Sequence, residues 1–428
     1  MLDLKFIRDN QDIVQRAADN KGVKVNIAEF LELDKKRRRL LSSVEVLRAE
    51  QNKKSKGKPS DEDIESLKTL KNKLQKAEEE FDSLEVGFSI LHNSIPNIPS
   101  DDTPIGSDES ANKVLRQVGK IPKFDFEPKE HWQIGRDLDI IDNERAAKVS
   151  GARFAYLKGG AAMLEFALVQ YAFSVLTNEK VLKKIIKSAG LKLRSTPFVP
   201  IIPPVLIKED VMHKMARLEP KEERYHIPSD NLYLVGSAEH TIGAMYIDEV
   251  LEEDQLPIRY IGFSTAFRRE AGSYGKDTKG IIRVHQFDKL EMESFTMPED
   301  SVAEQDFIVA IQEYLVSSLG LPYQVVAICT GDMGGPDARQ IDIETWMPGQ
   351  NKYRETHTSD MMTDYQARRL NTRVKLKDRK SVFVHMNDAT AFAGRTIIAI
   401  LENYQTKKGT VTIPKVLRKY MNGVKEIK

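Results

Sequence analysis

The chain has 428 residues, with 65 Lys and Arg against 64 Asp and Glu, so its formal net charge is +1. This length predicts two or three domains, because a single core seldom exceeds about 250–300 residues. Balanced charge excludes a uniformly basic nucleic-acid coat, but it allows a local basic patch. The single cysteine, Cys329, excludes an internal disulfide and a cysteine-based zinc site. Because we find neither a signal core at the start nor an uncharged apolar run approaching about 18 residues, we expect a cytoplasmic protein without a membrane partner.

Two heptad patterns predict an antiparallel coiled-coil hairpin over about residues 27–95. Hydrophobic residues recur at spacings of three and four from Phe30 to Gln51, and again from Leu67 to Leu91. Arg37 and Gln51 occupy seam positions, where we expect them to weaken the seam locally. At about 1.5 Å per residue, helices of about 30 residues should each be some 45 Å long.

Breaks and caps delimit this N-terminal domain, which we place at residues 1–100. Residues 1–20 predict one short amphipathic helix before the hairpin. Between the two long helices, Gly57 and Pro59 stop the first, and Ser60 with Asp63 has the form of a capping box that opens the second. Closely spaced prolines in the segment 94–102 predict a hinge.

From residue 105 to residue 428 the pattern changes to mixed helix and strand. Helices are predicted at 161–178, 301–319 and 396–404, and strands at 232–235, 259–264, 324–329, 341–347 and 381–385. Long intervals separate the strands, without a regular βαβ rhythm. We therefore expect an α+β domain with a mainly antiparallel sheet.

The segment Phe267 to Glu291 is the densest candidate for chemistry. Neither a G-x-x-x-x-G-K-[ST] loop nor a G-x-G-x-x-G loop occurs, so any phosphate must be held by side-chain cations. Two predicted strands joined by a polar loop carry Arg268, Arg269, Arg283 and Phe287. Arginine forks suit phosphate oxygens, and an aromatic face suits a purine. A charged surface hairpin without a ligand is the alternative interpretation.

Several segments, in order along the chain, resemble the motifs of class II aminoacyl-tRNA synthetases and, within that class, of seryl-tRNA synthetases. The forms F-R-x-E-A-G and R-x-H-Q-F-x-K-x-E, at 267–272 and 283–291, resemble motif 2. The other similar segments are Ile202-Pro203-Pro204 (motif 1), Ser237-Ala238-Glu239 (T-x-E), 331–334, 346–350, 353–355, 366–369 and Gly394-Arg395-Thr396 (motif 3). The resemblance covers nearly the whole chain. It implies a class II catalytic domain with an antiparallel sheet flanked by helices.

The resemblance implies that serine is activated with ATP and then transferred to tRNA. Arg268 and Arg395 would be the catalytic residues, because cations stabilise the charge that develops on the phosphates. Arg268 would hold the α-phosphate, Arg283 and Arg395 the γ-phosphate, and Phe287 would stack on adenine. The implied ATP-binding set is Arg268, Arg269, Glu270, Arg283, Val284, Phe287, Glu355, Thr356, His357, Thr358 and Arg395.

The resemblance also implies a magnesium site at Glu355 and Thr358, which match a metal-binding E-x-x-S step with Thr in place of Ser. Hard oxygen ligands beside a triphosphate suit Mg²⁺. Structural alternatives exist for these residues. Arg395 could be a solvated cation at a helix end, Phe287 could pack in the core, and Glu355 could form a salt bridge with a neighbouring cation.

The implied serine-binding set contains a departure from the family pattern. Its members are Ser237, Ala238, Glu239, Arg268, Glu291, Asn387, Ala389 and Thr390. Aligned back from Gly394-Arg395, Ala389 stands where the family has a Ser or Thr that contacts the substrate hydroxyl. Alanine cannot make that hydrogen bond, which puts discrimination against alanine and glycine in doubt. Thr390 could substitute if the backbone shifts.

The first hairpin helix carries a basic stretch, and the resemblance implies that it contacts tRNA. The candidates are Lys35, Lys36, Arg38, Arg39, Lys53 and Lys54, and Lys56 and Lys58 continue the charge to the tip. By the resemblance this arm would grip tRNA(Ser), and tRNA(Sec) where one exists, through backbone phosphates and shape. An ordinary solvated coiled-coil face is the alternative. The resemblance further implies a homodimer.

Two rival functions remain at this stage. A diverged paralogue could pass seryl-adenylate to another acceptor or activate a different small amino acid. A non-catalytic RNA-binding or structural coiled-coil protein is the second rival, although an intact set of ATP ligands would be of no use to it.

Overall fold

The computed structural model describes residues 1–55, 61–272, 275, 277 and 279–428, without the side chains of residues 61–64. The chain divides into two compact units, Met1–Ile98 and Pro99–Lys428. The capping box predicted at Ser60 and Asp63, and the basic residues Lys56 and Lys58, lie outside the described residues and side chains.

The first unit is entirely helical, with α1 (Leu4–Asp9), α2 (Gln11–Asn20), α3 (Ile27–Lys54) and α4 (Asp61–Ser94). The single helix predicted over residues 1–20 is wrong. Asn10 interrupts it with a non-helical φ of −136° and ψ of 41°, and its side-chain amide donates to the Phe6 carbonyl at 3.0 Å. Asn and its backbone-directed hydrogen bonds favour such helix ends.

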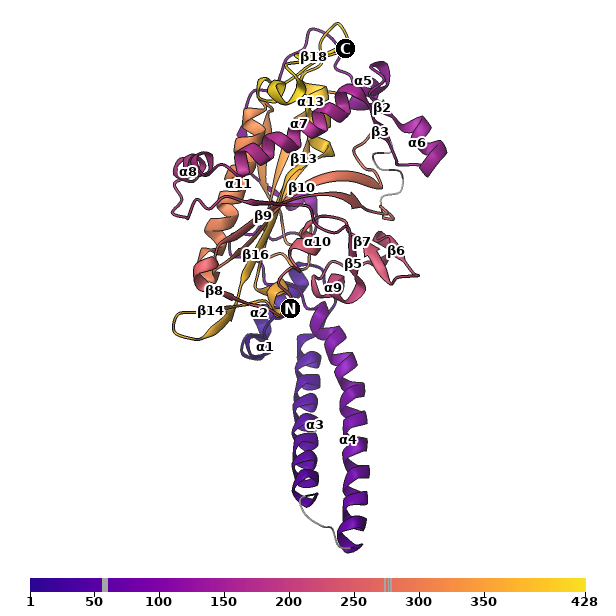
Figure 1. The fold of residues 1–428 in the computed structure, drawn as a ribbon, viewed down its shortest axis with the longest axis vertical. Coiled ribbons are helices and arrows are strands. Elements are labelled where there is room, and N and C mark those ends of the chain that lie inside the picture. Colours follow the sequence, from indigo (N-terminus) through magenta and orange to yellow (C-terminus); the bar gives the residue numbers. More distant parts are fainter. Residues whose placement is uncertain (56–60, 273–274, 276, 278) are drawn as a thin grey trace. The chain divides into compact units, whose positions relative to one another are not determined.

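The predicted helical hairpin is confirmed, with α3 and α4 lying side by side (Figure 1). Asn26 caps α3, because its side-chain oxygen accepts from the backbone N–H groups of Ala28 and Glu29. Along the seam, the rings of Phe30 and Phe88 stack with their centroids 5.0 Å apart. Apolar contacts between the two helices thus hold the hairpin together.

Arg37 does not leave a gap in the seam of this hairpin. Its Nε donates to Glu85 on α4 at 2.6 Å, and its guanidinium lies 4.8 Å from the Phe88 ring centroid. The local weakening expected at Arg37 is therefore replaced by a cross-helix ion pair and a cation–π contact. For Gln51 the expectation stays a prediction.

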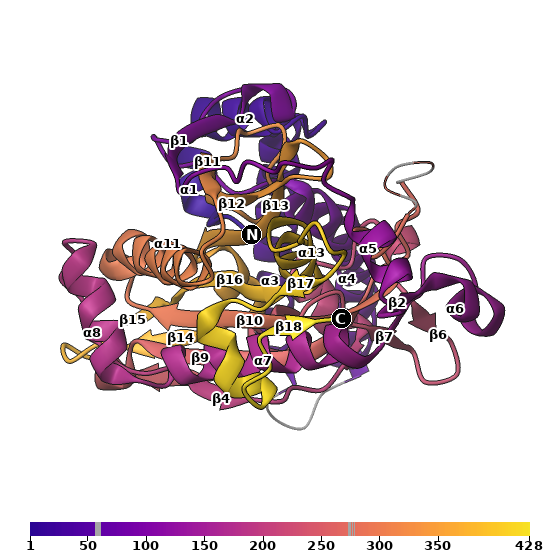
Figure 2. The ribbon, with the colours of Figure 1, turned by 90° about the horizontal axis from the view of Figure 1, so that it is seen from above.

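The second unit is built on an eight-stranded sheet with the order β1-β11-β12-β13-β16-β10-β9-β4. In Figure 2 this order runs from β1 at the top of the view to β4 at the bottom. All neighbours are antiparallel except β4 and β9, which confirms the predicted α+β class. The strands are β1 (Lys113–Val118), β4 (Val199–Ile201), β9 (Ile258–Phe267), β10 (Gln286–Thr296), β11 (Tyr323–Ala327), β12 (Arg339–Met347), β13 (Lys352–Thr363) and β16 (His385–Ala393).

Three helices cover one face of this sheet and form the main core with it. They are α7 (Gly159–Leu176), α11 (Ser301–Ser318) and α13 (Gly394–Asn403). Their apolar side chains, such as Leu164 and Ile311, belong to one buried cluster with Leu290 and Met292 of β10. Since side chains alternate along a strand, Lys289, Glu291 and Glu293 of the same strand face the other side.

The remaining elements of this unit are short. The helices are α5 (His131–Asp137), α6 (Asn143–Ser150), α8 (Glu179–Ser188), α9 (Glu209–Lys214), α10 (Glu239–Ile242) and α12 (Tyr365–Leu370), with 3-10 turns η1 (Glu109–Ala111), η2 (Lys221–Glu223), η3 (Glu253–Gln255), η4 (Pro298–Asp300) and η5 (Lys415–Met421). Small sheets pair β2 (Ile141–Asp142) with β3 (Tyr156–Leu157), β5 (Leu206–Lys208) and β6 (His226–Ile227) with β7 (Leu232–Leu234), β8 (Val250–Glu252) and β15 (Ser381–Phe383) with β14 (Arg373–Lys375), and β17 (Val411–Thr412) with β18 (Glu426–Ile427).

Helix α7 is, among the described residues, the single helix long and apolar enough to cross a membrane by length and composition. The helix predicted at 161–178 corresponds to α7, whose apolar run contains the polar residues Glu165 and Gln170. Leu164, Leu168 and Val175 belong to the main buried core. Packing against the sheet accounts for its apolar composition.

Arg259 and Glu304 form a fully buried ion pair between β9 and α11, with both nitrogen–oxygen distances at 2.6 Å. We expect Arg259→Met to lower the free energy of unfolding by about 3–5 kcal/mol, because it leaves the Glu304 carboxylate buried without its cation. Urea unfolding measures this loss. The double variant Arg259→Met/Glu304→Leu should recover much of it, and a loss below about 1 kcal/mol in the single variant would contradict the prediction.

Candidate active site

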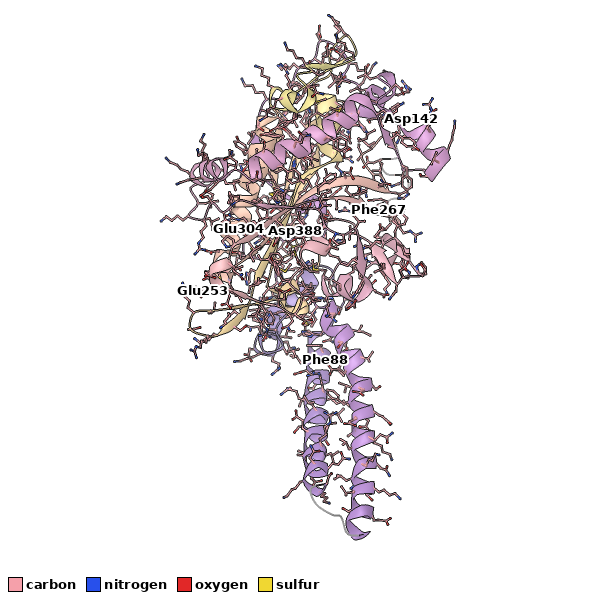
Figure 3. The ribbon with its side chains drawn as sticks, in the orientation of Figure 1. Phe88, Asp142, Glu253, Phe267, Glu304 and Asp388 are labelled. Atoms are coloured by element: carbon pink, nitrogen blue, oxygen red, sulfur yellow. The ribbon has the colours of Figure 1, made fainter. Side chains whose placement is uncertain are left out.

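The hairpin of β9 and β10 places the predicted motif 2 residues around one cavity. Arg268 follows the last residue of β9, and Phe287 is the second residue of β10. The Arg268 guanidinium carbon lies 5.4 Å from the Phe287 ring centroid. Figure 3 shows Phe267 toward the end of β9 and Asp388 near the middle of the sheet. The cavity is lined by Arg268, Glu270, Ile281, Ile282, Arg283, Val284, Phe287, Lys289, Glu355, Thr356, Thr358, Thr390, Ala393, Gly394 and Arg395.

Two arginines of this cavity are paired with carboxylates. Arg395, at the start of α13, lies 2.9 Å from Glu355, and Arg283 donates to Glu270 at 2.6 Å. The nearby Glu355 carboxylate raises the pKa of Arg395. Burial alone would raise the pKa of Glu355, but the charge and hydrogen bond of Arg395, together with the charges of Arg268 and Lys289, outweigh burial and lower it. Both groups of this pair are therefore charged at neutral pH.

The structure does not bring Arg269 and His357 to this cavity, although the resemblance implied both. The Arg269 guanidinium lies 6.0 Å from the Tyr225 ring centroid. His357 is buried, its ring lies edge-on to Phe392 at 5.8 Å, and burial lowers its pKa to about 4. His357 pairs with Ile343 of the core across β12, which places it on the helix-covered face.

A second cavity adjoins the first. Its lining is Arg217, Glu223, Arg224, Gly236, Ser237, Glu239, His240, Arg268, Glu270, Gly272, Arg283, Lys289, Thr358 and Asp360. Arg268, Glu270, Arg283, Lys289 and Thr358 line both cavities, so the two are parts of one site.

Opposite charges alternate around the second cavity. Lys289 donates to Ser237 at 3.2 Å and lies 2.8 Å from Glu291, and Arg217 lies 2.5 Å from Glu239. Burial raises the pKa of Glu291 to about 7 despite Lys289. Burial would raise the pKa of Glu239 as well, but the charge of Arg217, together with those of the neighbouring cations, outweighs burial and lowers it to about 2. Two carboxylates with different proton affinities thus lie beside the cavity.

A β-bulge decides which residue of β16 reaches the site. Register shifts between Leu290 and Glu291, so that Glu291 stands opposite Thr390 while Met292 stands opposite Ala389. Directly opposed residues share a face of the sheet. Ala389 therefore lies in the buried core with Met292, and Thr390 lines the first cavity. The bulge thus places Thr390, and not Ala389, in the lining of the site.

Asn387 and Ala238 do not line either cavity. Asn387 stands opposite Ser294 of β10, and the Ser294 hydroxyl donates to Glu304 of α11. Because directly opposed residues share a face of the sheet, Asn387 also lies on the helix-covered face. Ala238 is fully buried, at the N-cap of α10. Its role there is to carry Ser237 and Glu239 into the second cavity.

A row of three carboxyl groups crosses the centre of the sheet beneath the second cavity. Glu293, Asp388 and Asp360 stand directly opposite one another on β10, β16 and β13, and all are buried. Burial is the largest cause that raises the pKa of each of the three groups well above its ordinary value. Neighbouring carboxyl groups raise these pKa values further, Glu239 being the first of them for Asp388. Like charges opposed across strands are unfavourable, so the row retains protons.

Carboxyl groups around Glu355 form a further acidic patch at the first cavity. Glu344 stands directly opposite Glu355 on the neighbouring strand. The pKa of Asp342 is raised first by burial and then by the negative charge of Glu355. The Thr358 hydroxyl lies 3.3 Å from the Gln340 amide. These are hard oxygen donors whose mutual repulsion a cation would relieve, so the donor set fits a divalent ion.

Sequence reasoning missed Arg217, Asp342, Asp360 and Asp388. Arg217 follows the short helix α9 and reaches Glu239 and, at 3.4 Å, Asp388. Nothing in its local sequence marks it. Asp342 belongs to the strand predicted at 341–347, and Asp360 belongs to β13. In both strands polar and apolar residues alternate, and this alternation is the signal that could have indicated a charged face of the sheet.

The predicted tRNA-binding residues all lie on α3 in the first unit. Lys35, Lys36, Arg38, Arg39, Lys53 and Lys54 are exposed. Arg38 pairs with Asp34 at 3.0 Å and Lys35 with Glu32 at 3.6 Å. For Lys36, Arg39 and Lys53 the described part of the chain offers no acidic partner, which leaves these cations to solvent or to a ligand.

Comparison with known proteins identifies the family. Residues 1–99 match the seryl-tRNA synthetase N-terminal domain, and residues 223–404 match the tRNA synthetase class II core domain (G, H, P, S and T). A serine–tRNA ligase from Thermodesulfovibrio yellowstonii is 40% identical, with 98% of this chain and 99% of the relative covered. The chain belongs to the serine–tRNA ligase family. It is therefore an aminoacyl-tRNA ligase, and the predicted family and enzyme class are confirmed.

Solved structures of this family have the same fold. The crystal structure of seryl-tRNA synthetase from Pyrococcus horikoshii complexed with ATP matches with a TM-score of 0.87 and 37% identity, covering 100% of this chain and 99% of that one. The Naegleria fowleri cytoplasmic serine–tRNA ligase in complex with AMP matches with a TM-score of 0.84 and 31% identity, covering 100% and 99%. A prolyl-tRNA synthetase from Giardia lamblia, 16% identical with a TM-score of 0.54 over 67% of this chain and 53% of that one, shares the fold alone.

Because burial raises the pKa of Glu291 to about 7, this group should titrate near neutrality, far above the ordinary value of 4.5. We expect the carboxylate to prevail above about pH 7 and the neutral acid below it. Carbon-13 NMR of the labelled glutamate side chains measures this ionisation. The signal should disappear in Glu291→Gln, and titration of every glutamate below about pH 5 would contradict the prediction.

Proposed function

We propose that the chain activates L-serine with ATP and transfers the seryl group to tRNA(Ser), using the two adjoining cavities as its active site. The observation that supports this proposal is their shared lining. A pocket with arginines and an aromatic ring meets a pocket with paired carboxylates at Arg268 and Lys289. A nucleotide in the first pocket and an amino acid in the second would therefore bring their reacting groups together.

The first step joins the serine carboxylate to the α-phosphorus of ATP. A carboxylate oxygen forms the new bond, the bond to the bridging oxygen breaks, and pyrophosphate leaves. Arg268 lies where both pockets meet, so it would neutralise charge on the α-phosphate. Arg283 and Arg395 would exchange their carboxylate partners, Glu270 and Glu355, for the terminal phosphates. In the second step a terminal ribose hydroxyl of tRNA attacks the acyl carbon, and AMP leaves.

Serine recognition would use both strands that meet at the bulge. Glu239 and Glu291 provide negative charge for the substrate ammonium, with Ser237 beside them. Thr390 provides the hydroxyl that Ala389 lacks, on the same sheet face as Glu291. Alanine would be rejected because it has no hydroxyl, so its binding would leave the buried Thr390 hydroxyl without a hydrogen-bond partner.

We infer that Mg²⁺ would be held by Glu355 and Thr358, with Asp342 and Glu344 close enough to add negative charge. When bound, the ion would supply charge neutralisation for the phosphates and fix their orientation. Glu355 and Thr358 are two ligands, fewer than Mg²⁺ needs, so phosphate oxygens would complete the coordination.

A homodimer in the cytoplasm is part of the same proposal. Phe166 of α7 is 56% exposed and Ile202, beside the motif 1 prolines, is 84% exposed, with Met163 and Val199 also exposed. If these side chains form one apolar patch, an interaction site is the usual reason for it. A second copy of the chain would cover it.

The helical arm would bind the tRNA through the exposed cations of α3. Contacts to phosphates position an RNA without reading its bases, which suits recognition of tRNA(Ser), and of tRNA(Sec) where present, by shape. Removal of the arm's cations should then affect charging and leave the activation step unchanged.

Pyrophosphate exchange tests the activation step and its specificity. With serine, alanine, glycine, threonine and cysteine as substrates, exchange should be strongest with serine. Thr390→Val, which keeps the shape and removes the hydroxyl, should reduce the preference for serine over alanine by at least about 10²-fold. Ala389→Ser is the matched control and should leave specificity unchanged, because position 389 lies in the core. A wild-type preference for another amino acid would refute the proposed substrate.

Charge reversal tests the arm. The triple variant Lys36→Glu, Arg39→Glu and Lys53→Glu should lose at least about tenfold in kcat/KM for tRNA and flatten its salt dependence, because each lost phosphate contact reduces both. Serine-dependent exchange should stay at the wild-type level.

The matched control is Lys183→Glu, Lys184→Glu and Lys187→Glu on α8, which makes the same change in charge at exposed positions. Equal effects of the two triple variants on charging would mean that α3 is not a specific tRNA contact.

A further inference from the structure

A buried histidine and glutamate lie behind the first cavity, outside its lining. His131 begins α5, Glu402 belongs to the last turn of α13, and neither side chain is exposed. Glu402 Oε1 accepts from the backbone N–H of His131 at 3.0 Å and lies 3.3 Å from His131 Nδ1. The carboxylate therefore fixes both the start of α5 and the orientation of the imidazole ring.

The other ring nitrogen of His131 holds the segment that lines the cavity. The backbone N–H of Ile281 donates to Nε2 at 3.2 Å. Nε2 must therefore be the unprotonated nitrogen, and Nδ1 carries the proton toward Glu402. Gly280 makes this approach possible, since a Cβ there would lie 2.1 Å from Nε2, and its φ is +72°.

Helix α13 contacts the same segment at a second point. Arg395, in its first turn, lies with Nε 3.5 Å from the Ile282 carbonyl. Ile281, Ile282, Arg283 and Val284 all line the first cavity. Helix α13 therefore contacts the backbone of this segment in two ways. Arg395 at the start of the helix contacts it directly, and Glu402 at the end of the helix acts through His131.

Glu402 also fixes the turn between β12 and β13. Its Oε2 accepts from the backbone N–H of Gly349 at 2.9 Å, and its Oε1 accepts from the Gln350 side chain at 3.1 Å. The strand that follows this turn carries Glu355 and Thr358 into the cavity. A single buried carboxylate therefore connects both walls of the nucleotide pocket.

We propose that His131, oriented by Glu402, is a positioning residue for ATP, because its Nε2 holds the Ile281–Val284 wall in the geometry that the nucleotide needs. The proposal rests on the proposed use of ATP in this cavity. His131 touches no substrate and acts through the Ile281 N–H. Its loss should weaken ATP binding far more than serine binding, because Arg283 is the one residue of this wall that also lines the second cavity.

The test compares His131→Phe, which keeps a ring and removes the acceptor, with His131→Gln, which can accept from Ile281. Calorimetry on the full chain should show ATP binding at least about tenfold weaker in His131→Phe, since an unpaired buried N–H is costly. His131→Gln should recover most of this loss. In pyrophosphate exchange, KM for ATP should rise and KM for serine should stay within about twofold.

His92→Gln is the matched control, because His92 is also buried and makes a hydrogen bond to the backbone, its Nε2 donating to the Leu2 carbonyl at 2.8 Å in the first unit. It should leave ATP affinity unchanged. A thermal unfolding experiment shows whether His131→Phe is folded. If it is not, Gly280→Ala replaces it, because the added Cβ would displace the same wall, and this variant should also weaken ATP binding at least about tenfold.

ATP affinity within about twofold of wild type in folded His131→Phe, or an equal loss for ATP and serine, would overturn the inference. Failure of wild-type exchange with serine would instead refute the proposed function, because calorimetry measures ATP binding independently of the amino acid.

Discussion

The two-faced central sheet is the constraint on which the rest of the second unit depends. Along β10, Leu290 and Met292 enter the core, while Lys289, Glu291 and Glu293 lie on the opposite face of the sheet, where Lys289 lines both cavities. A register slip of one residue would exchange the two sets, placing charges under the helices and apolar groups in the site. Packing of α7, α11 and α13 against one face therefore fixes the chemistry of the other.

Charge pairing explains how such a site can be folded before any substrate is bound. Two of the cations that face the phosphate pocket have a carboxylate partner, Arg395 with Glu355 and Arg283 with Glu270. Unpaired buried charges are costly, and paired ones are tolerated. An entering phosphate can replace the carboxylate at the arginine, so the pairs keep the cations ordered without blocking their use. The carboxyl row at Glu293 and Asp388 meets the same cost by retaining protons.

Local patterns predicted a large part of the fold and of the nucleotide pocket. The heptads of the hairpin and the strand-loop-strand around Arg268 are each specified by residues close in sequence, because helix and strand periodicities are local properties. Features that depend on a distant partner were missed or misjudged. Arg37 was expected to weaken its seam, but Glu85 on the other helix pairs with it. Arg217 gave no signal, since its role depends on Glu239 and Asp388 from other elements.

The sequence by itself determined the family, the order of the motifs and the types of side chain available for phosphate and ammonium. Tertiary structure alone decided which of them meet. The bulge that aims Thr390 at Glu291 and buries Ala389 is a property of the pairing between β10 and β16. The contact between His131 and Ile281 joins residues 150 positions apart. Hydrogen-bond register and long-range packing are set by the whole fold, so no local pattern could have specified them.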